Sequence, residues 1–454
     1  MRQNLQNPEA DGANPTLAKE FEIGQPAIAS STKLKPASAT REIAVTLLTG
    51  GIDRPYTFGL AMELISKGAA LEMIGSDGVD FPEFHSTPGI SFLNLQGNQR
   101  ADVSLISKVL RLLVYYAKVM RYAAAAKPKI FHILWNNKFQ LFDRTLLTIF
   151  YRLLGKKIVL TVHNVNAARR DSKDTFLNRL TLRIQYRLAD NIFVHTQKMK
   201  RELLEEFGVP EGRVTVIPFG INNAVPNTSL SGSEARQHLG IPANKKTMLF
   251  FGRITPYKGL EYLISAFQQL AGCDGYQLIV CGRPENDCQS YWSEIQERIT
   301  EDVRLGRILL RAEHIPDAET EIYFKAADVL VLPYRQIYHS GVLFLGYSFG
   351  LPVLAADVGP LKEEIVEGET GSIFKPEDPA DLARAIESYF VSNLFANLDK
   401  RRREICEYAS ERYSWGVVGK ATLDVYAALL NLYSSNQGPA RKTRPTILGT
   451  KTPS

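Results

Sequence analysis

The second half of the chain contains, at residues 250 to 267, the stretch FFGRITPYKGLEYLISAF. Its first residues complete an apolar run, KTMLFF, with the length of a buried strand, and its later residues begin a helix at Gly259. Arg253 and Lys258 therefore lie between a strand and a helix N-terminus, where unpaired amides favour anions. Arg offers a planar fork for phosphate oxygens and Lys adds a mobile charge, so the pair suits a diphosphate. The alternative is two ordinary solvated loop cations.

A second informative stretch, at residues 338 to 365, reads YHSGVLFLGYSFGLPVLAADVGPLKEEI. Ser340 and Gly341 are predicted to open a helix that Gly350 closes, and the strand PVLAA follows. Small residues where a helix begins let a ligand's phosphate approach backbone amides closely, so this turn is a second candidate for phosphate binding. Helix capping alone is the alternative explanation of Ser340 and Gly350.

Short apolar segments alternate with helix-length amphipathic segments through most of the chain. This alternation is typical of parallel sheets with crossover helices, so the sequence predicts an α/β protein with two doubly wound sheets. The candidate strands are residues 43–48, 71–74, 92–95, 130–134, 157–162, 191–194 and 214–217 in the first half, and 247–251, 276–281, 308–310, 329–332 and 353–355 in the second. Ligands of such sheets bind beyond the carboxyl ends of the strands, so we expect the two domains to face each other across one cleft.

The composition divides the chain into two domains and flanking segments. Residues 1–40 contain a single aromatic residue, residues 435–454 are similarly poor in apolar side chains, and both are predicted to be disordered tails. We expect a first Rossmann-like domain at residues 41–222 and a second at residues 236–414. The turn-rich segment at residues 223–235 is predicted to link them.

The first half offers further candidate site residues. Gly51 belongs to a Gly pair that follows the first strand, where a flexible turn lets the backbone line a cleft. His163 and His195 end two strands, so both imidazoles are expected to point toward the cleft, where one can hydrogen-bond a sugar hydroxyl or a developing charge. A structural role is more common for any single His, but the long basic loop after His163 favours a function there.

The sequence lacks the motifs of several other kinds of functional site. The four Cys show no Cys-x-x-Cys pair or zinc-like spacing, which is typical of a reducing compartment. Neither an Asp-x-Asp motif nor a cluster with metal-ligand spacing occurs, so no metal and no cofactor are expected. The Ser-His-Asp, nucleophile-elbow and Walker patterns are also missing. The chain has neither a signal-peptide core nor about 18 uninterrupted apolar residues, so we expect a cytoplasmic protein.

The net charge of +6 conceals a strong asymmetry. Residues 105 to 201 hold 20 Lys and Arg against four Asp, an excess of 16 positive charges, while the 34 basic and 44 acidic residues elsewhere leave an excess of ten negative charges. Two segments, with Lys108, Arg111, Lys118 and Arg121 and with Arg179, Arg183 and Arg187, read as amphipathic basic helices. Such a surface suits anionic lipid headgroups; solvated helix faces are the alternative. Nucleic acid is not expected, because no recognised binding module accompanies the charge.

Together these motifs resemble a known family, the retaining glycosyltransferases of family 4, which have the two-domain GT-B fold. The likeness covers about residues 42 to 434. It is most specific at residues 250–267, at IPFGIN (217–222), at FGLPVLAADVGPLKEEI (349–365) with EGETG (367–371), and at YSWGVVGKATLDVYAALL (413–430). In that family the last helix crosses back onto the first domain, a role that residues 415–434 are expected to take.

The resemblance implies a metal-independent, hexosyltransferase-type enzyme. It would move a sugar from a nucleoside-diphosphate sugar to a glycan or lipid-linked acceptor in polysaccharide or glycolipid biosynthesis. The basic surface of the first half favours a peripheral position at the inner face of the plasma membrane. The residues that the resemblance assigns are Arg253 and Lys258 for the donor diphosphate, backbone at Ser340, Gly341 and Val342, and His163 for the transferred sugar. Gly51 and Gly252, in the turns that follow two strands, are further candidates to contact the donor. No protein nucleophile is evident, so the resemblance implies a front-face route in which the departing phosphate helps to deprotonate the acceptor hydroxyl.

The chain departs from the family at one pair of positions. The family usually has two glutamates separated by seven residues, and counting back from Gly350 places Ile337 and Leu345 there. Tyr338, His339 or the backbone are candidates to replace them. Two other functions stay open: a catalytically inactive partner subunit with the same fold, or a nucleotide-sugar 2-epimerase, which needs cleft carboxylates that the sequence does not identify.

Overall fold

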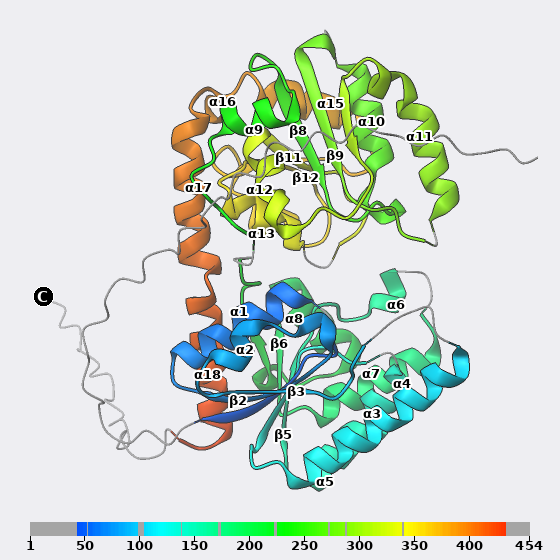
Figure 1. Ribbon diagram of the computed structural model, residues 1–454, viewed down its shortest axis with the longest axis vertical. Helices are drawn as coiled ribbons and strands as arrows, with labels where there is room; N and C mark the ends of the chain where they lie inside the picture. The colour runs from blue at the N-terminus through cyan, green and yellow to red at the C-terminus, as the bar shows by residue number, and fades with distance from the viewer. Residues whose placement is uncertain are drawn as a thin grey trace, which may run out of the picture. The chain divides into compact units, whose positions relative to one another are not determined.

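A computed structural model describes residues 43–432, apart from residues 52, 99–103, 138, 171–173, 222–224, 271–272, 287 and 338–339 (Figure 1). The two predicted disordered tails, residues 1–40 and 435–454, lie outside the described residues, as do Tyr338 and His339. Within the described residues no helix is both long enough and apolar enough to cross a membrane.

The first half forms a seven-stranded sheet in which every neighbouring pair of strands is parallel. Its strand order, β3-β2-β1-β4-β5-β6-β7, reverses direction at β1, as in a doubly wound sheet. The strands are β1 (Ala44–Leu48), β2 (Ala70–Gly75), β3 (Ile90–Asn94), β4 (Ile130–Ile133), β5 (Lys157–Thr161), β6 (Asn191–Val194) and β7 (Val214–Val216). All seven correspond to predicted strands, with ends that differ by at most two residues.

Helices connect these strands. The main ones are α1 (Arg54–Ser66), α2 (Pro82–Ser86), α3 (Leu105–Ala125), α7 (Phe176–Leu188) and α8 (Gln197–Phe207). Between β4 and β5 the chain coils without a break through α4 (Gln140–Phe142), a π-helical turn η2 (Asp143–Leu147) and α5 (Thr148–Leu153). The remaining short elements are η1 (Asp77–Val79), α6 (Ala167–Arg170) and η3 (Glu211–Arg213).

The second half forms a six-stranded parallel sheet in the order β10-β9-β8-β11-β12-β13. Its strands are β8 (Lys246–Phe251), β9 (Tyr276–Cys281), β10 (Ile308–Arg311), β11 (Val329–Leu332), β12 (Val353–Ala356) and β13 (Gly371–Phe374). The last strand is missing from the sequence prediction. It has four residues and opens with Gly371, so it lacks the β-branched run by which the other strands were recognised.

The helices of the second half cover both faces of this sheet. They are α9 (Gly232–Leu239), α10 (Leu260–Gln269), α11 (Gln289–Arg304), α12 (Asp317–Ala326), α13 (Gly341–Ser348), α14 (Leu361–Glu364), α15 (Pro379–Tyr389), α16 (Asn393–Ala396) and α17 (Leu398–Tyr413), with the 3₁₀ turns η4 (Pro256–Lys258) and η5 (Cys273–Gly275). Helix α9 begins inside the segment that was predicted to be a linker. A capping box sets its start, because Glu234 N donates to Ser231 Oγ at 3.2 Å and Ser231 N donates to Glu234 Oε2 at 2.7 Å.

The last helix, α18 (Trp415–Leu429), packs against α1 of the first half (Figure 1). Its Tyr426 hydroxyl lies 2.6 Å from His132 Nδ1 on β4, and Trp415 Nε1 donates to the Ile221 carbonyl at 2.8 Å. Burial lowers the pKa of His132 to about 3, so the imidazole is neutral at physiological pH. A buried polar contact thus ties the last described helix to the first sheet.

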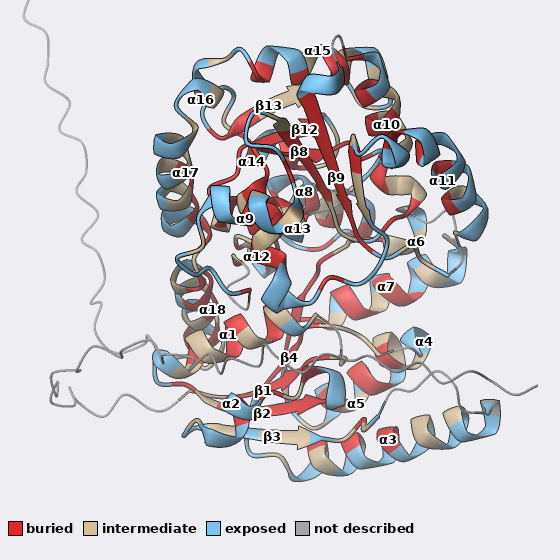
Figure 2. Cartoon of the chain, turned by 45° about the horizontal axis from the view of Figure 1, so that its top comes forward, coloured by how far each residue is buried: buried red, intermediate tan, exposed pale blue. Residues whose placement is uncertain are grey.

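Both sheets are covered on their two faces, which explains their strand composition (Figure 2). Every residue of β6 (NIFV) and of β11 (VLVL) is buried. A strand that is covered on both faces has a nearly continuous apolar sequence, because neither face is left to solvent. The structure therefore confirms the predicted α/β architecture of two doubly wound parallel sheets.

Candidate active site

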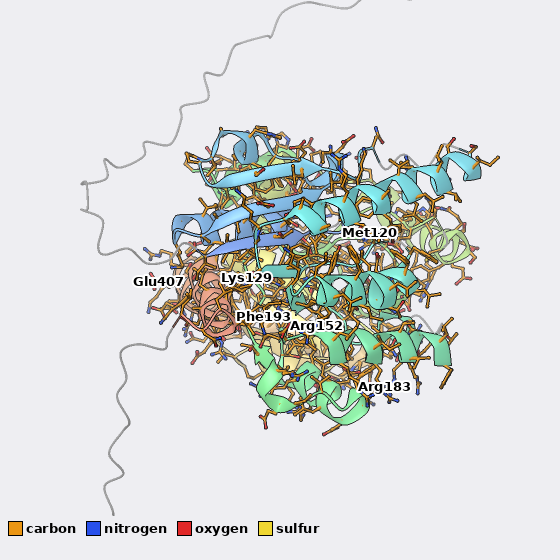
Figure 3. The ribbon with its side chains drawn as sticks, turned by 90° about the horizontal axis from the view of Figure 1, so that it is seen from below. Met120, Lys129, Arg152, Arg183, Phe193 and Glu407 are labelled. Carbon is orange, nitrogen blue, oxygen red and sulfur yellow. The ribbon has the colours of Figure 1, made fainter. Side chains whose placement is uncertain are left out.

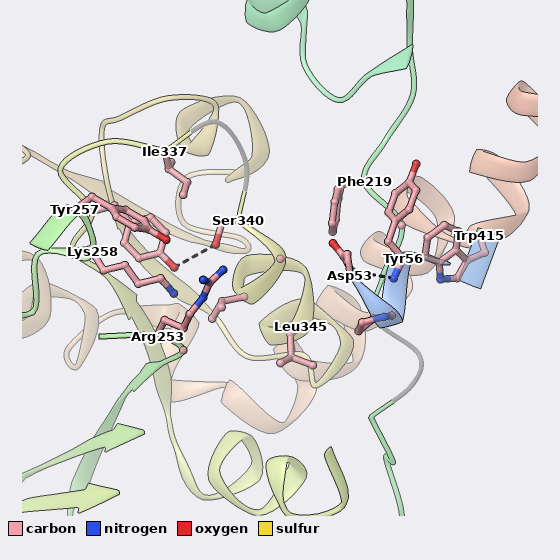
Figure 4. Close-up of a pocket in the computed structure, with 16 residues that line it drawn as sticks. Asp53, Tyr56, Phe219, Arg253, Tyr257, Lys258, Ile337, Ser340, Leu345 and Trp415 are labelled. Atoms are coloured by element: carbon pink, nitrogen blue, oxygen red, sulfur yellow. Dashed lines mark hydrogen bonds between the residues drawn. The ribbon is translucent and has the colours of Figure 1, made fainter. Parts of the chain in front are cut away.

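A cavity of about 370 Å³ lies where the loops after strands of both sheets meet. Figure 4 shows Arg253, Lys258 and Ser340 on one side of it and Asp53, Phe219 and Trp415 on the other. The lining residues are Asp53, Pro55, Tyr56, Phe219, Gly220 and Trp415 from one side, and Gly252, Arg253, Tyr257, Lys258, Tyr334, Ile337, Ser340, Gly341, Val342 and Leu345 from the other. The cavity is therefore placed at the carboxyl ends of the strands, where doubly wound sheets bind ligands.

The turn after β8 positions the two cations. Gly252 has a φ of 107°, a region that favours glycine, and its N–H donates to the Cys281 carbonyl at 2.9 Å. A Cβ at Gly252 would lie 2.5 Å from Lys258 Nζ, so any larger residue would displace the ammonium group. Gly259, with a φ of 66°, then ends η4 and begins α10. The two glycines allow Arg253 and Lys258 to reach the same cavity.

Lys258 is an unusual lysine because its side chain is buried, with 7% of the residue exposed. Burial, and secondarily the nearby positive charge of Arg253, lower the pKa of Lys258 to about 7. Its ammonium nitrogen lies 5.3 Å from the centre of the Tyr334 ring. Arg253 Nη1 forms an ion pair with Glu285 Oε1 at 2.5 Å. An anion in the cavity would restore the charged form of Lys258 and relieve the repulsion between the two cations.

The start of α13 forms the adjoining wall. Ser340 is its N-cap, since the Leu343 N–H lies 3.3 Å from Ser340 Oγ, and Tyr334 Oη lies 3.3 Å from the same oxygen. Ser340, Gly341 and Val342 all line the cavity. The sequence singled out residues in two separate stretches of the second half. The structure brings them together around one cavity, with Gly252, Arg253 and Lys258 from the first stretch.

Ile337 and Leu345 also line the cavity, at the positions where the family usually carries glutamates. Among the described lining residues the one carboxylate is Asp53, which comes from the opposite wall. It is the N-cap of α1, with Tyr56 N donating to its Oδ1 at 3.1 Å, and it adopts left-handed backbone angles of 53° and 73°. Burial raises the pKa of the Asp53 carboxyl to about 6.

Aromatic rings form the wall on which Asp53 lies. The Tyr56 ring contacts Phe219 and Trp415 at centroid distances of 5.4 and 5.2 Å, and Phe219 stacks on Phe344 of α13 at 5.7 Å. Asp53 and Tyr56 line the cavity but were not predicted from the sequence. The available signal was their place directly after the Gly pair that follows β1, at the same sheet edge as the other strand-end candidates.

His163 and His195 do not lie on the wall of this cavity. Both are buried, and His195 Nε2 lies 3.0 Å from His163 Nδ1. His163 stacks on Trp135 with the ring centroids 3.7 Å apart, and its ring centroid lies 4.8 Å from that of Tyr56, a residue that does line the cavity. Aromatic packing around Tyr56 buries His163, and its expected position facing the cleft stays a prediction. Its contact with a transferred sugar stays a prediction.

Gly51 also lies away from the cavity lining. Its φ is 70°, and a Cβ there would lie 2.4 Å from Gln96 Oε1 and 2.7 Å from Ser76 Oγ. Close packing against these two side chains accounts for the glycine, and its proposed ligand contact stays a prediction. No group of three or more His, Cys, Asp or Glu that could hold a metal ion occurs among the described residues.

Two family models match the chain, one in each half. The model described as Glycosyltransferase Family 4 matches residues 50–225, and the model described as Glycosyl transferases group 1 matches residues 232–412. The two matched segments together make up most of the chain, and they contain Asp53, Arg253, Lys258 and the start of α13.

Among curated proteins the chain is similar to D-inositol 3-phosphate glycosyltransferases. It is 25% identical over 279 residues to that of Corynebacterium aurimucosum, covering 60% of this chain and 64% of the relative. It is 27% identical over 291 residues to that of Corynebacterium diphtheriae, covering 61% and 66% respectively. The chain thus spans less than two thirds of the length of these relatives.

Solved structures share the fold. A sucrose-phosphate synthase from Thermosynechococcus elongatus has a TM-score of 0.69 and 20% identity, covering 86% of this chain and all of the other. Anabaena HepE, solved in complex with UDP and glucose, has a TM-score of 0.67 and 17% identity, covering 85% and 100%. At these identities the likeness shows the fold alone. With the two family models and the two facing sheets in agreement, the chain belongs to the family 4 glycosyltransferases and has the GT-B fold.

Proposed function

We propose that this protein transfers a hexose from a nucleoside-diphosphate sugar to a hydroxyl group of a glycan or lipid-linked acceptor, with retention of the anomeric configuration. The observation that carries this proposal is the meeting of Arg253 and the buried Lys258 with the start of α13 in one cavity. The names of similar proteins support it, since the curated relatives are called D-inositol 3-phosphate glycosyltransferases and HepE was solved with UDP and glucose.

The donor diphosphate lies against Arg253 and Lys258 in this proposal. Negative charge develops on the leaving diphosphate when the bond from the anomeric carbon to the phosphate oxygen breaks, and fixed cations in a partly dehydrated site stabilise it there. Two protein cations supply the charge, so no metal ion is required. Backbone amides at Ser340, Gly341 and Val342 add hydrogen bonds at a helix N-terminus.

In this proposal Asp53 contacts the acceptor during the transfer reaction. Its carboxylate accepts a hydrogen bond from the attacking hydroxyl and orients it toward the anomeric carbon. The new bond forms between the acceptor oxygen and that carbon, and the acceptor proton moves to the departing phosphate oxygen. The products are the glycoside and the nucleoside diphosphate, which together account for all atoms of the donor and acceptor.

Calorimetric titration with UDP, GDP and ADP tests the diphosphate site. We expect the Arg253→Ala variant to bind the preferred diphosphate about 10 to 100 times more weakly, because one charge-assisted contact is lost. Arg384→Ala is the matched control, since Arg384 pairs with Asp381 on the surface of the same half and away from the cavity. Equal affinity of Arg253→Ala and the unchanged protein would remove the phosphate assignment.

A second candidate function is a partner subunit that binds the donor without transferring the sugar. The observation that favours it is specific: apolar Ile337 and Leu345 line the cavity where the resemblance leads one to expect carboxylates. Incubation of the isolated chain with the nucleotide sugar that binds best decides between the two. Release of nucleoside diphosphate supports the enzyme, and the NMR coupling of the anomeric proton in the product reports retention.

The charge asymmetry supports a site of action at the cytoplasmic, anionic face of a membrane, in polysaccharide or glycolipid assembly. The excess of 16 positive charges at residues 105 to 201 would attract such a surface over a Debye length of about 8 Å at physiological salt. A lipid-linked acceptor would then be held beside the first sheet. Lipid extracts carrying the acceptor should therefore serve as substrates.

A further inference from the structure

Large apolar side chains are exposed over one restricted part of the first half. Of the 17 exposed large hydrophobic residues among the described residues, 13 lie between residues 106 and 180. They lie on α3, on and beside the α4–η2–α5 segment, and on α7, and we call this surface the apolar face. Ile106, Leu153 and Phe176 are each more than 80% exposed. Contiguous apolar surface of this kind marks an interaction site in a soluble protein.

Helix α3 shows that the exposure is patterned. Ile106, Val109, Leu110, Leu113 and Val114 follow the 3-and-4 spacing of one helix face, and all five are exposed. The residues that bury the helix against the sheet lie further along, at Tyr115, Tyr116, Val119 and Ala123. The first half of α3 therefore carries a second apolar stripe that does not serve the core.

The three helical segments form one continuous surface. The Tyr116 hydroxyl of α3 donates to Asp143 Oδ1 of η2 at 2.9 Å, and Arg144 Nη1 of η2 donates to Asn178 Oδ1 of α7 at 2.8 Å. Figure 3 shows the helices in a row, with Met120 on α3, Arg152 on α5 and Arg183 on α7. Apolar side chains from segments that are far apart in sequence thus share one side of the molecule.

Cations interleave with the apolar side chains, whereas carboxylates do not. Lys118, Arg121 and Arg183 are exposed on α3 and α7. The one carboxylate within the described residues of α3, α4, η2, α5 and α7 is Asp143, which is 4% exposed and accepts the Tyr116 hydroxyl. Two cations of these helices are paired with neighbouring carboxylates, Arg152 with Asp190 and Arg179 with Asp174. The surface thus combines apolar groups with an excess of positive charge.

The combination of exposed apolar side chains and cations indicates what kind of partner binds the apolar face. A second copy of the chain would bring the same positive face against it, so like charges would oppose self-association. An anionic phospholipid surface satisfies both features, because acyl chains take up the apolar groups and headgroup phosphates pair with the cations. We propose that the apolar face lies within the headgroup region of an anionic membrane and inserts its exposed apolar side chains. This proposal deepens the membrane site suggested above and does not depend on sugar transfer.

Sedimentation of the full-length protein with vesicles tests the apolar face in the absence of nucleotide sugar. Vesicles of phosphatidylcholine mixed with phosphatidylglycerol should retain the protein, vesicles of phosphatidylcholine alone should retain much less, and added salt should release it. The double variant Leu110→Asp, Leu113→Asp should bind at least about tenfold more weakly, because it places two charges among the inserted side chains. Val391→Asp is the matched control, since Val391 is 82% exposed beyond α15 in the other half.

Charge-reversal variants measure the electrostatic contribution to vesicle binding separately from the contribution of the apolar side chains. Lys118→Glu with Arg121→Glu should lose the preference for phosphatidylglycerol, whereas Lys420→Glu, which changes an exposed cation on α18, should keep it. Since all these positions are exposed, equal melting temperatures should exclude misfolding. The proposal is overturned if the unchanged protein does not bind anionic vesicles at low salt, or if Leu110→Asp, Leu113→Asp binds like the unchanged protein. It is also overturned if sedimentation shows a dimer that the same double variant dissociates, because the occupant would then be a second copy.

Transfer to a water-soluble acceptor without vesicles keeps the two proposals apart. The Leu110→Asp, Leu113→Asp variant should retain this reaction and lose only transfer to acceptor in vesicles. A protein that binds vesicles but transfers no sugar would leave the apolar face intact and count against the proposed function.

Discussion

Among the described residues, three that are not glycine adopt positive φ, namely Asp53, Glu377 and Asn431, and Asp53 is the one that lines the cavity. Left-handed backbone costs an aspartate roughly 1 kcal/mol. Burial of the carboxylate adds to that cost, as its pKa of about 6 shows. Because Asp53 is unfavourable both in its backbone angles and in the burial of its charge, and lies in the candidate active-site cavity, we expect it to contribute to catalysis.

The Asp53→Asn variant tests this expectation. Asparagine also caps helices and tolerates left-handed angles, so α1 should remain intact. The raised pKa of Asp53 means that the ionised carboxyl destabilises the folded state once the pH rises through about 4 to 6. We therefore expect the variant to gain about 1 kcal/mol of stability at pH 7 and to lose about 100-fold in kcat, with nucleoside-diphosphate affinity unchanged. Unchanged kcat would exclude a catalytic role; Glu377→Asn, at the other positive-φ carboxylate, is the control.

The lowered pKa of Lys258 predicts a pH dependence of donor binding. Below pH 7 the ammonium group is already charged in the empty site, so affinity should be constant there. Above pH 7 the site must take up a proton when the diphosphate binds, because the anion raises the pKa of Lys258. Affinity should fall by up to about tenfold per pH unit. Calorimetry at pH 8 in two buffers of different ionisation enthalpy should show uptake of nearly one proton, and no uptake would contradict the assignment.

At the scale of elements, the contact between α1 and α18 depends on a glycine. A Cβ at Gly59 in α1 would lie 2.0 Å from Trp415 Cε2 in α18, and the ring also fills the space beside Gly220. This close approach lets the last helix dock on the first. Helix propensity alone would favour alanine at this position by up to about 1 kcal/mol, so the packing requirement opposes the local one.

We expect Gly59→Ala to destabilise the protein by about 2 kcal/mol or more, because the displaced indole also holds the Ile221 carbonyl. Gly416→Ala is the matched control in α18. A Cβ there meets its nearest atom, Ser414 Oγ, at 3.6 Å, an ordinary contact, so the substitution should be neutral or slightly stabilising. Urea unfolding curves of the two variants measure the difference. Equal stability of Gly59→Ala and Gly416→Ala would show that the packing around Trp415 relaxes without cost.

At the scale of the whole molecule, α18, the last described helix, packs against the first half of the chain. Trp415, Val418, Thr422 and Tyr426 are all buried, although they follow the second sheet in sequence. We expect truncation after Ser414 to remove the cooperative thermal transition of the first half, because several large side chains are lost from its core and each is worth about 2 to 5 kcal/mol. Addition of a peptide spanning residues 415 to 432 should restore it in part. An unchanged melting curve by circular dichroism would contradict this dependence.

The sequence predicted the helices and strands far better than it predicted the contacts between distant segments. Twelve of the thirteen strands were identified from runs of apolar residues, because strands covered on both faces carry little else. The strand β13 was missed because it starts with Gly371 and has only four residues. Arg253, Lys258 and the start of α13 were predicted to bind a ligand because each lies at a strand end or helix start, and they do line one cavity.

By itself the sequence determined the two doubly wound sheets, the turn that carries Arg253 and Lys258, and the basic character of residues 105 to 201, since periodicity, glycine and charge are local properties. The tertiary structure decided what those features face. It buries His163 beside Tyr56 and Trp135, brings Asp53 to the cavity of Lys258, and turns the second apolar stripe of α3 outward. The reason is physical: which side chains share a cavity or a surface depends on packing between segments far apart in sequence, and no local pattern records that packing.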